Sequence, residues 1–211
     1  MKICIINGSQ KTGESNTEAI LERLKGFLNK TYEINIFNCG LKPLTNEMLD
    51  KVICADAIIL MFPLFVHSLP SNTLRTLIEL ENIIKNQNKK ELIIYTIVNN
   101  GFYEGKQNHI AFDIIKNWCD QTGVKFGGGI GQGAGEMISR TKHLPKERDL
   151  FKNLNYALQT MAENIETKQP MGIQYLTPNF PKFLWQFMAV RNWNNLAKNN
   201  GLKKKDILKR L

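Results

Sequence analysis

The sequence has few cysteines, and they lack the spacings that cysteine chemistry requires. Cys4, Cys39, Cys54 and Cys119 are far apart in the 211-residue chain and form no C-x-x-C pair. This excludes the usual patterns of zinc ribbons, iron–sulfur clusters and dithiol redox sites. We therefore expect free, reduced thiols and no bound metal, with Cys4 and Cys119 buried as small apolar residues.

Long hydrophobic runs are also missing. The longest apolar run, Ala57 to Val66, is interrupted by Pro63 and is about half as long as a membrane-spanning helix requires. Lys2 leads directly into the strand-like Ile3–Ile6, which does not resemble the apolar segment of a signal peptide. We expect no transmembrane helix and a cytoplasmic protein.

The loop after this first apolar segment lacks both common nucleotide-binding motifs. Gly8 and Gly13 have the spacing of a Walker A loop, but Glu14 stands where the phosphate-binding Lys belongs. Gln10 occupies the second glycine position of G-x-G-x-x-G. Neither a triphosphate loop nor a standard dinucleotide loop is therefore expected.

The same loop is rich in hydroxyl groups and ends at a predicted helix N-terminus. Residues 15–18 read Ser-Asn-Thr-Glu, a capping box in which a hydroxyl and a carboxylate each satisfy a backbone N–H. The positive end of a helix favours an anion, so the loop suits one phosphomonoester. The alternative is that Ser15 only caps the helix and the other hydroxyls are solvated.

Positive charge is concentrated at the end of the chain. The formal net charge is +9, and from Lys182 onward eight Lys or Arg residues stand against Asp206, which leaves only +2 for the rest. Because the body is nearly neutral, the charge does not indicate a nucleic-acid-binding protein, and we expect no nucleic-acid partner.

Strand-length apolar runs alternate with segments of helical period. The predicted strands are residues 2–7, 32–37, 57–62, 91–98 and 124–130. The helical stripes expected in the core are Ile20, Leu24, Phe27 and Leu28; Leu74, Leu77, Ile78 and Ile84; Ala111, Ile114, Ile115, Trp118 and Cys119; and Leu154, Ala157, Leu158, Met161 and Ile165. Residues 46–55 favour a further short helix. The pattern predicts an α/β, flavodoxin-like fold: a five-stranded parallel sheet of order 2-1-3-4-5, with helices on both faces.

Ligands of such sheets bind beyond the carboxyl ends of the strands. The third strand is followed by an apolar, aromatic loop between Pro63 and Pro70, and the fourth by the glycine turn 99–105. An anion loop, an aromatic loop and a glycine turn on one edge suit a ligand with one phosphate and a flat polar ring, and FMN is such a ligand. Simple loop packing is the alternative, and His67 is expected to be a surface residue. The glycine-rich end of strand five, 127–135, indicates close backbone approach or mobility beside the cofactor pocket.

The three loops resemble those of the NAD(P)H-dependent FMN reductases and NAD(P)H dehydrogenases of the flavodoxin-like superfamily. Residues 7–17 resemble the family's G-S-x-R/K…S-N-T phosphate loop, 62–70 its P-L-Y…P loop and 99–102 its third flavin loop. The resemblance covers about residues 1–165. Phe65 replaces the common Tyr, so the hydrogen bond of that hydroxyl is absent.

The resemblance implies a set of FMN-binding residues. Ser9, Lys11, Ser15, Asn16 and Thr17 would hold the phosphate, and Pro63, Leu64, Phe65, Val66, Asn99, Asn100, Gly101 and Phe102 would flank the isoalloxazine. It also implies that FMN takes hydride from NADPH or NADH and passes it to a small acceptor such as a quinone, a flavin or a nitro compound. A homodimer is implied as well, and no side chain is assigned as catalytic.

Residues 168–211 exceed this core domain, which we place at residues 1–167. Residues 177–181 indicate an extended connector, and Lys182–Asn199 a helix that is apolar nearly all round and therefore expected to be clasped by protein. Three roles remain open for the basic end: docking on a partner subunit near its flavin, peripheral contact with an anionic membrane surface, or a solvated terminus packed on its own domain.

Two other function classes remain beside the reductase. One is a flavodoxin-type electron carrier with no nicotinamide reaction of its own, although carriers of that type tend to be acidic. The other is a non-catalytic binding module that keeps the fold and has lost FMN.

Overall fold

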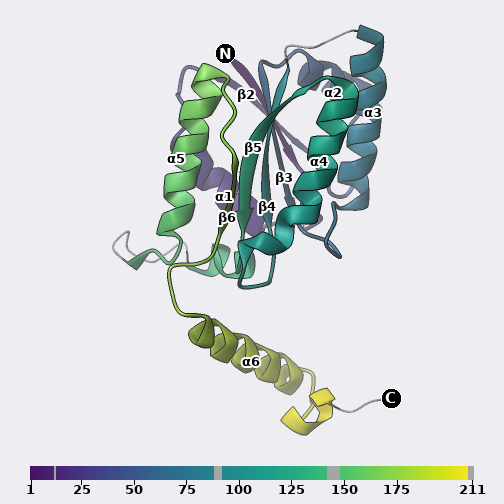
Figure 1. Ribbon diagram of the computed structural model, residues 1–211. Coiled ribbons are helices and arrows are strands. Elements are labelled where there is room, and N and C mark those ends of the chain that lie inside the picture. The colour runs from purple at the N-terminus through teal and green to yellow at the C-terminus, as the bar shows by residue number, and fades with distance from the viewer. Residues whose placement is uncertain (12, 88–91, 142–147, 209–211) are drawn as a thin grey trace. The chain divides into compact units, whose positions relative to one another are not determined.

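The computed structural model describes residues 1–11, 13–87, 92–141 and 148–208. These residues form a parallel sheet covered by helices on both faces (Figure 1). The strands are β1 (Lys2–Asn7), β2 (Glu33–Asn38), β3 (Ala57–Pro63), β4 (Ile93–Asn99), β5 (Lys125–Gln132) and β6 (Ile173–Leu176). The helices are α1 (Asn16–Lys25), α2 (Asn46–Ile53), α3 (Ser71–Gln87), α4 (His109–Thr122), α5 (Lys152–Thr167) and α6 (Lys182–Asn199).

The strand order is β2-β1-β3-β4-β5-β6, and every neighbouring pair is parallel. The predicted order of the first five strands is confirmed, but the predicted number of strands is wrong because β6 adds a sixth at the edge. The sequence pattern did not reveal β6, since it is four residues long and no residue in it is fully buried. Of the predicted strands, only the start of the fourth, at Glu91, lies outside the described residues.

The two faces of the sheet bury alternate residues of each strand. In β1, Cys4 and Ile6 pack against α2, α3 and α4, whereas Ile3 and Ile5 pack against α1 and α5. Figure 1 shows these two helical layers on opposite sides of the sheet. Because both faces are covered, the strands read as continuous apolar runs, which is why the sequence revealed them.

The glycines of β5 make room for the groups around that strand. A Cβ on Gly127 would lie 2.8 Å from the Tyr95 ring, and one on Gly128, which has a positive φ of 84°, would lie 2.6 Å from Met171 O. A Cβ on Gly131 would lie 3.0 Å from the Tyr175 ring and 3.1 Å from Asn108 Nδ2, which leaves little room for a side chain. The close backbone approach that the sequence indicated is therefore present: the missing side chains let the Tyr95 ring and the segment that contains β6 pack directly against β5.

One predicted apolar stripe is only half buried. In α3, Leu77 and Ile84 are buried as expected, but Leu74 and Ile78 are exposed. The helix instead buries two threonines, Thr73 and Thr76. These positions lie on the same face as Leu77 and Leu80, so the buried face is rotated away from the one that the hydrophobic pattern indicated. Phe27, just after α1, is also partly exposed.

The four cysteines are free, as predicted. Cys4, Cys39 and Cys119 are buried and Cys54 is exposed. Burial raises the pKa of the Cys4 thiol to about 11 and that of Cys119 to about 12. These two thiols are therefore apolar packing residues at neutral pH.

The chain forms two compact units, Met1–Pro178 and Asn179–Leu211. Residues 168–178, which the sequence pattern assigned to the extension, contain β6 and so contribute to the sheet. In the second unit, α6 ends at Asn199, Gly201 follows with a positive φ of 73°, and a short 3-10 helix spans Lys204–Leu208. Within the described part of the chain, no helix is both long and apolar enough to cross a bilayer.

Candidate functional site

Asn99, the last residue of β4, connects the three loops that the sequence singled out. Its side-chain Oδ1 accepts a hydrogen bond from Thr17 Oγ1 at 3.0 Å, at the start of α1. Its backbone O accepts one from the Leu64 N–H at 2.8 Å, in the loop after β3. The anion loop, the aromatic loop and the glycine turn therefore meet at one rim of the sheet, the rim formed by the carboxyl ends of the strands.

The loop after β1 reaches the first turn of α1 in the predicted way. Ser15 is the N-cap, and its Oγ accepts a hydrogen bond from the Glu18 N–H at 3.0 Å. The second half of the predicted capping box differs, because the Glu18 carboxylate accepts a hydrogen bond from Asn7 Nδ2 at 3.3 Å. Asn7 Oδ1 in turn accepts from the Ser9 N–H at 2.9 Å, so Asn7 fixes the beginning of the loop.

A cavity of about 450 Å³ lies beside this loop. Three of the predicted phosphate residues, Ser9, Lys11 and Ser15, contribute to its lining. Among the described residues, the lining comprises Asn7, Ser9, Lys11, Gly13, Ser15, Glu18, Asn38, Leu41 and Lys42. Two lysines stand against one glutamate, and the N-terminus of α1 adds partial positive charge, so the cavity favours an anion.

Lys42 is a candidate site residue that the sequence did not reveal. It belongs to the loop after β2, which packs directly on the loop after β1, since a Cβ on Gly40 would lie 1.9 Å from Ser9 O. The Asn72 side chain also donates to Gly40 O at 3.1 Å. Gly40 is the one signal in the sequence for this close approach, and its partner loop is not evident from the pattern.

Asn16 and Thr17 have a different place from the other predicted phosphate residues. Asn16 Oδ1 accepts hydrogen bonds from Ser139 Oγ at 2.7 Å and from the Ser139 N–H at 3.2 Å. Thr17 is buried and donates to Asn99. Their side chains thus join α1 to neighbouring segments, and what they offer an anion is the positive end of the helix that they begin.

The loop after β3 carries exposed apolar side chains on a tight turn. Phe65 and Ser68 exchange two backbone hydrogen bonds, of 2.9 and 2.8 Å, around Val66 and His67. Both central residues have positive φ, 46° and 62°, which is unusual for a β-branched residue such as Val66. Val66 is 95% exposed and Phe65 43% exposed, while Pro63 and Leu64 are half-buried beneath them.

The loop after β4 faces the loop after β3 through a ring contact. The rings of His67 and Phe102 are nearly parallel, with centroids 5.8 Å apart and an interplanar angle of 14°. Phe102 is 47% exposed and Gly101 is exposed as well. Aromatic surface from two neighbouring loops is therefore available to a flat ligand at this rim.

Asn100 fixes the loop after β4 through three hydrogen bonds, and within the described part of the chain its side-chain Oδ1 has no partner. Its N–H donates to Gln132 O at 3.0 Å, its O accepts from the Gly135 N–H at 2.7 Å, and its Nδ2 donates to Glu104 O at 3.3 Å. Its Oδ1 is buried and has no hydrogen-bond partner among the described residues. An orphaned buried acceptor is costly unless a ligand or water supplies a donor. Such an acceptor fits a ring N–H of the kind that a flavin carries.

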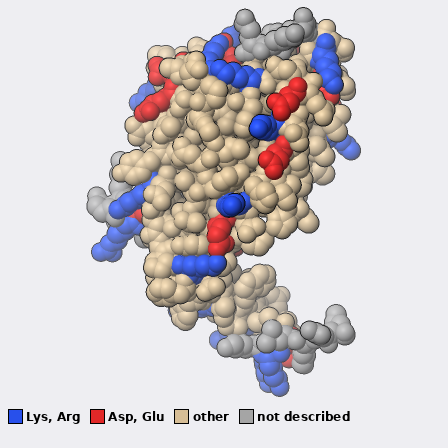
Figure 2. All heavy atoms as spheres, in the orientation of Figure 1, with Lys and Arg blue, Asp and Glu red and all other residues tan. Residues whose placement is uncertain are grey.

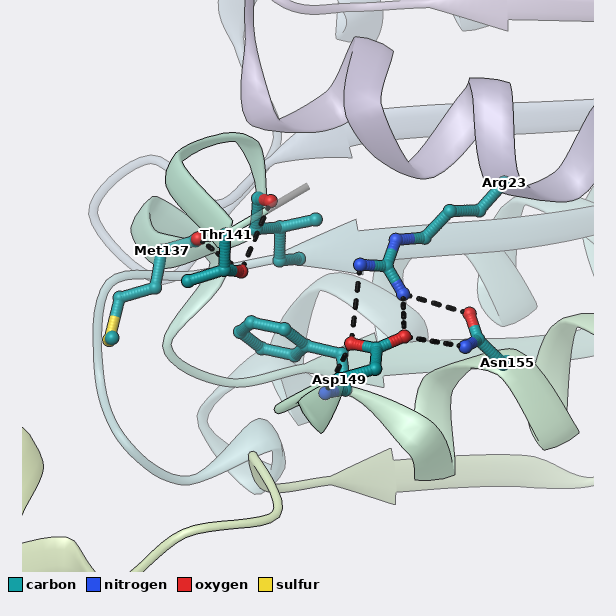
Figure 3. Close-up of polar contacts among 7 residues, drawn as sticks. Arg23, Met137, Thr141, Asp149 and Asn155 are labelled. Atoms are coloured by element: carbon teal, nitrogen blue, oxygen red, sulfur yellow. Dashed lines mark hydrogen bonds and ion pairs between the residues drawn. The ribbon is translucent and has the colours of Figure 1, made fainter. Parts of the chain in front are cut away.

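A second cavity, of about 510 Å³, is lined by residues along the length of α1. Ser15 and Glu18 line both cavities, and here they are joined by Arg23 of α1 and by Asp149 and Asn155. Arg23 donates to Asp149 Oδ2 at 2.7 Å and to Asn155 Oδ1 at 2.9 Å (Figure 3). This network fixes the position of α1 against the start of α5.

Asp149 is ionised within that network. Burial by itself raises the pKa of Asp149, but hydrogen bonds from Arg23, the Phe151 N–H and Asn155 outweigh burial and hold the pKa below its usual value. Both charged side chains are largely buried, so the pair is shielded from solvent. The helix that bears the anion-favouring N-terminus is thus anchored by a charged contact at its other end.

The chain matches no protein-family model and no curated protein sequence. Solved structures do match it. An NADH:FMN oxidoreductase, EmoB in its apo form, aligns with a TM-score of 0.60 at 12% identity, over 80% of this chain and 89% of that one. An NADPH-quinone reductase from P. pentosaceus aligns with a TM-score of 0.59 at 15% identity, over 77% and 98%. A flavodoxin from Streptococcus pneumonia TIGR4 aligns with a TM-score of 0.51 at 13% identity, over 80% and 99%.

These likenesses agree with the sequence resemblance at the level of the fold. Each alignment covers about four fifths of this chain and most of the other protein. At such low identity the match carries architecture and not residue roles. The chain therefore has the flavodoxin-like fold, in company with proteins named as FMN and quinone reductases.

Proposed function

We propose that this chain is an FMN-dependent oxidoreductase that takes hydride from NADPH or NADH and passes it to a small acceptor. The observation that carries the proposal is the junction at Asn99, which brings the anion-favouring loop, the aromatic loop and the glycine turn to one rim. The named reductases among the structures of the same fold support it.

The residues present fit FMN in three respects. Ser9, Lys11 and the α1 N-terminus offer the phosphate hydrogen-bond donors and positive charge. The exposed rings of Phe65 and Phe102 offer apolar surface to the isoalloxazine. FMN would supply the hydride chemistry, and the chain would bind it, orient it and shield one side of the ring from water.

The remaining predicted residues support these contacts. Val66 and Gly101 are exposed at the same two loops, while Pro63, Leu64, Asn99 and Asn100 form the base on which those loops rest. Asn100 Oδ1 would accept a hydrogen bond from a ring N–H, which would satisfy the orphaned acceptor. We assign no side chain as a general acid or base.

Flavin reduction by nicotinamide tests the function. The purified chain, loaded with FMN, is mixed with NADPH or NADH without oxygen, and flavin absorbance near its visible maximum is followed. Rapid bleaching by either nicotinamide supports the reductase. Bound flavin that neither nicotinamide bleaches would indicate an electron carrier, and a protein that takes up no FMN would indicate a non-catalytic module.

Comparing FMN with riboflavin tests the proposed phosphate site. Lys11→Gln should weaken FMN binding by about five-fold, the size of one charged contact near the surface, and leave riboflavin binding unchanged. Lys116→Gln removes an exposed lysine on α4 outside the cavity and serves as the matched control. Equal loss of FMN and riboflavin binding, or loss in the control, would contradict the assignment. Both affinities can be measured by the quenching of flavin fluorescence.

A further inference from the structure

The unit Asn179–Leu211 combines exposed apolar side chains with strong positive charge. Among its described residues, those with exposed large apolar side chains are Phe183, Leu184, Phe187, Met188, Val190, Trp193, Leu196, Leu202 and Ile207. It carries eight Lys or Arg residues and one acidic residue, Asp206, for a net charge of +7. By contrast, Figure 2 shows acidic and basic side chains interspersed over the visible face of Met1–Pro178, where the net charge is only +2.

The most exposed apolar side chains of α6 share one face. Phe183, Phe187, Val190 and Trp193 follow one another at spacings of four, three and three residues, which places them along one side of a helix. Phe183 is 65% exposed, Phe187 64% and Trp193 64%. We call these four residues the α6 aromatic face.

Basic residues lie along one edge of the α6 aromatic face. Arg191 comes four residues after Phe187, and Lys198 comes seven residues after Arg191, so both lie along the same edge. Both are exposed. The helix itself contains no Asp or Glu. Apolar rings flanked by cations are the pattern of a helix that lies in the boundary between lipid headgroups and acyl chains.

We propose that α6 binds the surface of an anionic lipid bilayer, with the α6 aromatic face inserted between the headgroups and its basic edge on the lipid phosphates. The helix would lie in the plane of the surface, since it is not apolar enough to span the bilayer. The charge of +7 supplies the attraction to negative lipid, and the exposed Phe and Trp rings supply the apolar insertion.

Two other occupants of this surface agree less well with its composition. A second copy of the same unit would bring one charge of +7 against another in a symmetric contact, which is repulsive. A nucleic acid would satisfy the cations but leave exposed aliphatic side chains such as Val190 and Leu196 in contact with a charged backbone. A bilayer satisfies both kinds of side chain.

Co-sedimentation of the full chain with vesicles tests the proposal. We expect binding to vesicles of phosphatidylglycerol mixed with phosphatidylcholine, little binding to phosphatidylcholine alone, and weakening as salt is raised. Arg191→Gln with Lys198→Gln should weaken binding roughly 25-fold, about five-fold for each charge. Lys116→Gln with Lys152→Gln removes the same charge from α4 and α5 and should leave binding unchanged.

Apolar insertion is tested separately from charge. Phe183→Ser with Phe187→Ser should weaken binding about ten-fold or more, with net charge preserved. Trp193 fluorescence should shift to the blue on adding anionic vesicles, and Trp193→Phe should abolish the shift. Trp185→Phe, in which the half-buried tryptophan of the same helix is replaced, should retain it. Circular dichroism and the melting temperature show that each variant is folded.

Three results would overturn the proposal. One is equal binding to neutral and anionic vesicles, and another is binding that neither the charge pair nor the phenylalanine pair affects. The third is no vesicle binding, with dimers by light scattering that the phenylalanine pair dissociates, or retention of a duplex DNA oligomer that the charge pair abolishes. In the third case the occupant is a second copy if dimers form, and a nucleic acid if the duplex is retained. None of these results depends on flavin or nicotinamide.

Discussion

Asn99 has an influence on the candidate site that its residue type does not suggest. Its side chain is bonded to the first turn of α1 and its backbone to the loop after β3, so one residue sets the spacing of three loops. Asn99 and Thr17 are both largely buried. A hydrogen bond in such surroundings is strengthened by the low local dielectric, and breaking it leaves an uncompensated polar group.

Thr17→Val tests this contact with little change in shape. Valine keeps the volume of threonine but cannot donate to Asn99 Oδ1, so the buried acceptor is left unsatisfied. We expect the free energy of unfolding to fall by about 1–3 kcal/mol, as measured by urea denaturation. Thr160→Val, at a partly exposed position on α5, is the matched control and should change it by no more than about 0.5 kcal/mol. Equal effects of the two substitutions would show that the Thr17–Asn99 bond adds nothing specific.

At the scale of elements, α1 is held at both ends. Its N-terminus is joined to β4 through Thr17, and near its C-terminus Arg23 is paired with Asp149 in front of α5. The second contact is distant from the three loops, yet it fixes the helix whose positive end faces the proposed phosphate. We therefore expect α1 to contribute both to the stability of the fold and to anion binding.

The Arg23–Asp149 contact predicts a particular pH dependence. Because the pKa of Asp149 is lowered in the folded protein, its contribution is complete above the unfolded pKa of about 3.9 and is lost as the pH falls through the lower folded pKa. Asp149→Asn should therefore cost roughly 2–4 kcal/mol at pH about 7, and the difference from wild type should shrink in acid. Urea denaturation at neutral and acidic pH measures both. A difference that stays constant with pH would contradict ionisation of Asp149 as the cause.

The elements that the sequence predicted are those whose burial is periodic. β1, β3 and β4 are buried on both faces, so they read as unbroken apolar runs. The predicted stripes of α4 and α5 are buried with the helical period, whereas those of α1 and α3 are buried only in part, because Phe27, Leu74 and Ile78 are exposed. β6 was missed because it is a short edge strand with no fully buried residue, and it pairs with the glycine-rich end of β5. The buried threonines of α3 were missed because a hydrophobic pattern does not register them.

The candidate site was predictable to a similar extent. Residues at the end of a strand or just beyond it, such as Asn99 and Ser9, could be placed at the carboxyl rim from the alternation alone. Lys42 could not, since its approach to the loop after β1 depends on a tertiary contact at Gly40. The Glu18 carboxylate accepts from Asn7 Nδ2 and not from the backbone N–H of the predicted capping box. The sequence likewise does not indicate which of these two nearby donors Glu18 would bind.

For the whole molecule, charge and apolar exposure are divided between two units. Met1–Pro178 contains all six strands of the sheet and is nearly neutral, whereas Asn179–Leu211 contains most of the net charge and, among its described residues, nine exposed large apolar side chains. Exposing so many apolar side chains to water is unfavourable, and a large exposed apolar patch usually marks a binding surface. This is the physical reason to look for a surface that α6 binds.

The division predicts where the chain can be shortened. Ending it at Pro178 keeps β6 and should change the free energy of unfolding of the sheet domain by no more than about 1 kcal/mol, because Asn179–Leu211 is compact by itself. Ending it at Thr167 removes β6 and the buried Met171, together with an acceptor of the Tyr95 hydroxyl at Gln169 O, and should cost at least about 3 kcal/mol. Urea denaturation followed by the fluorescence of Trp118, which both shortened chains retain, gives the comparison. If the two shortened chains were equally stable, β6 would contribute nothing to the sheet, and if the chain ending at Pro178 failed to fold, the last residues would be part of the domain.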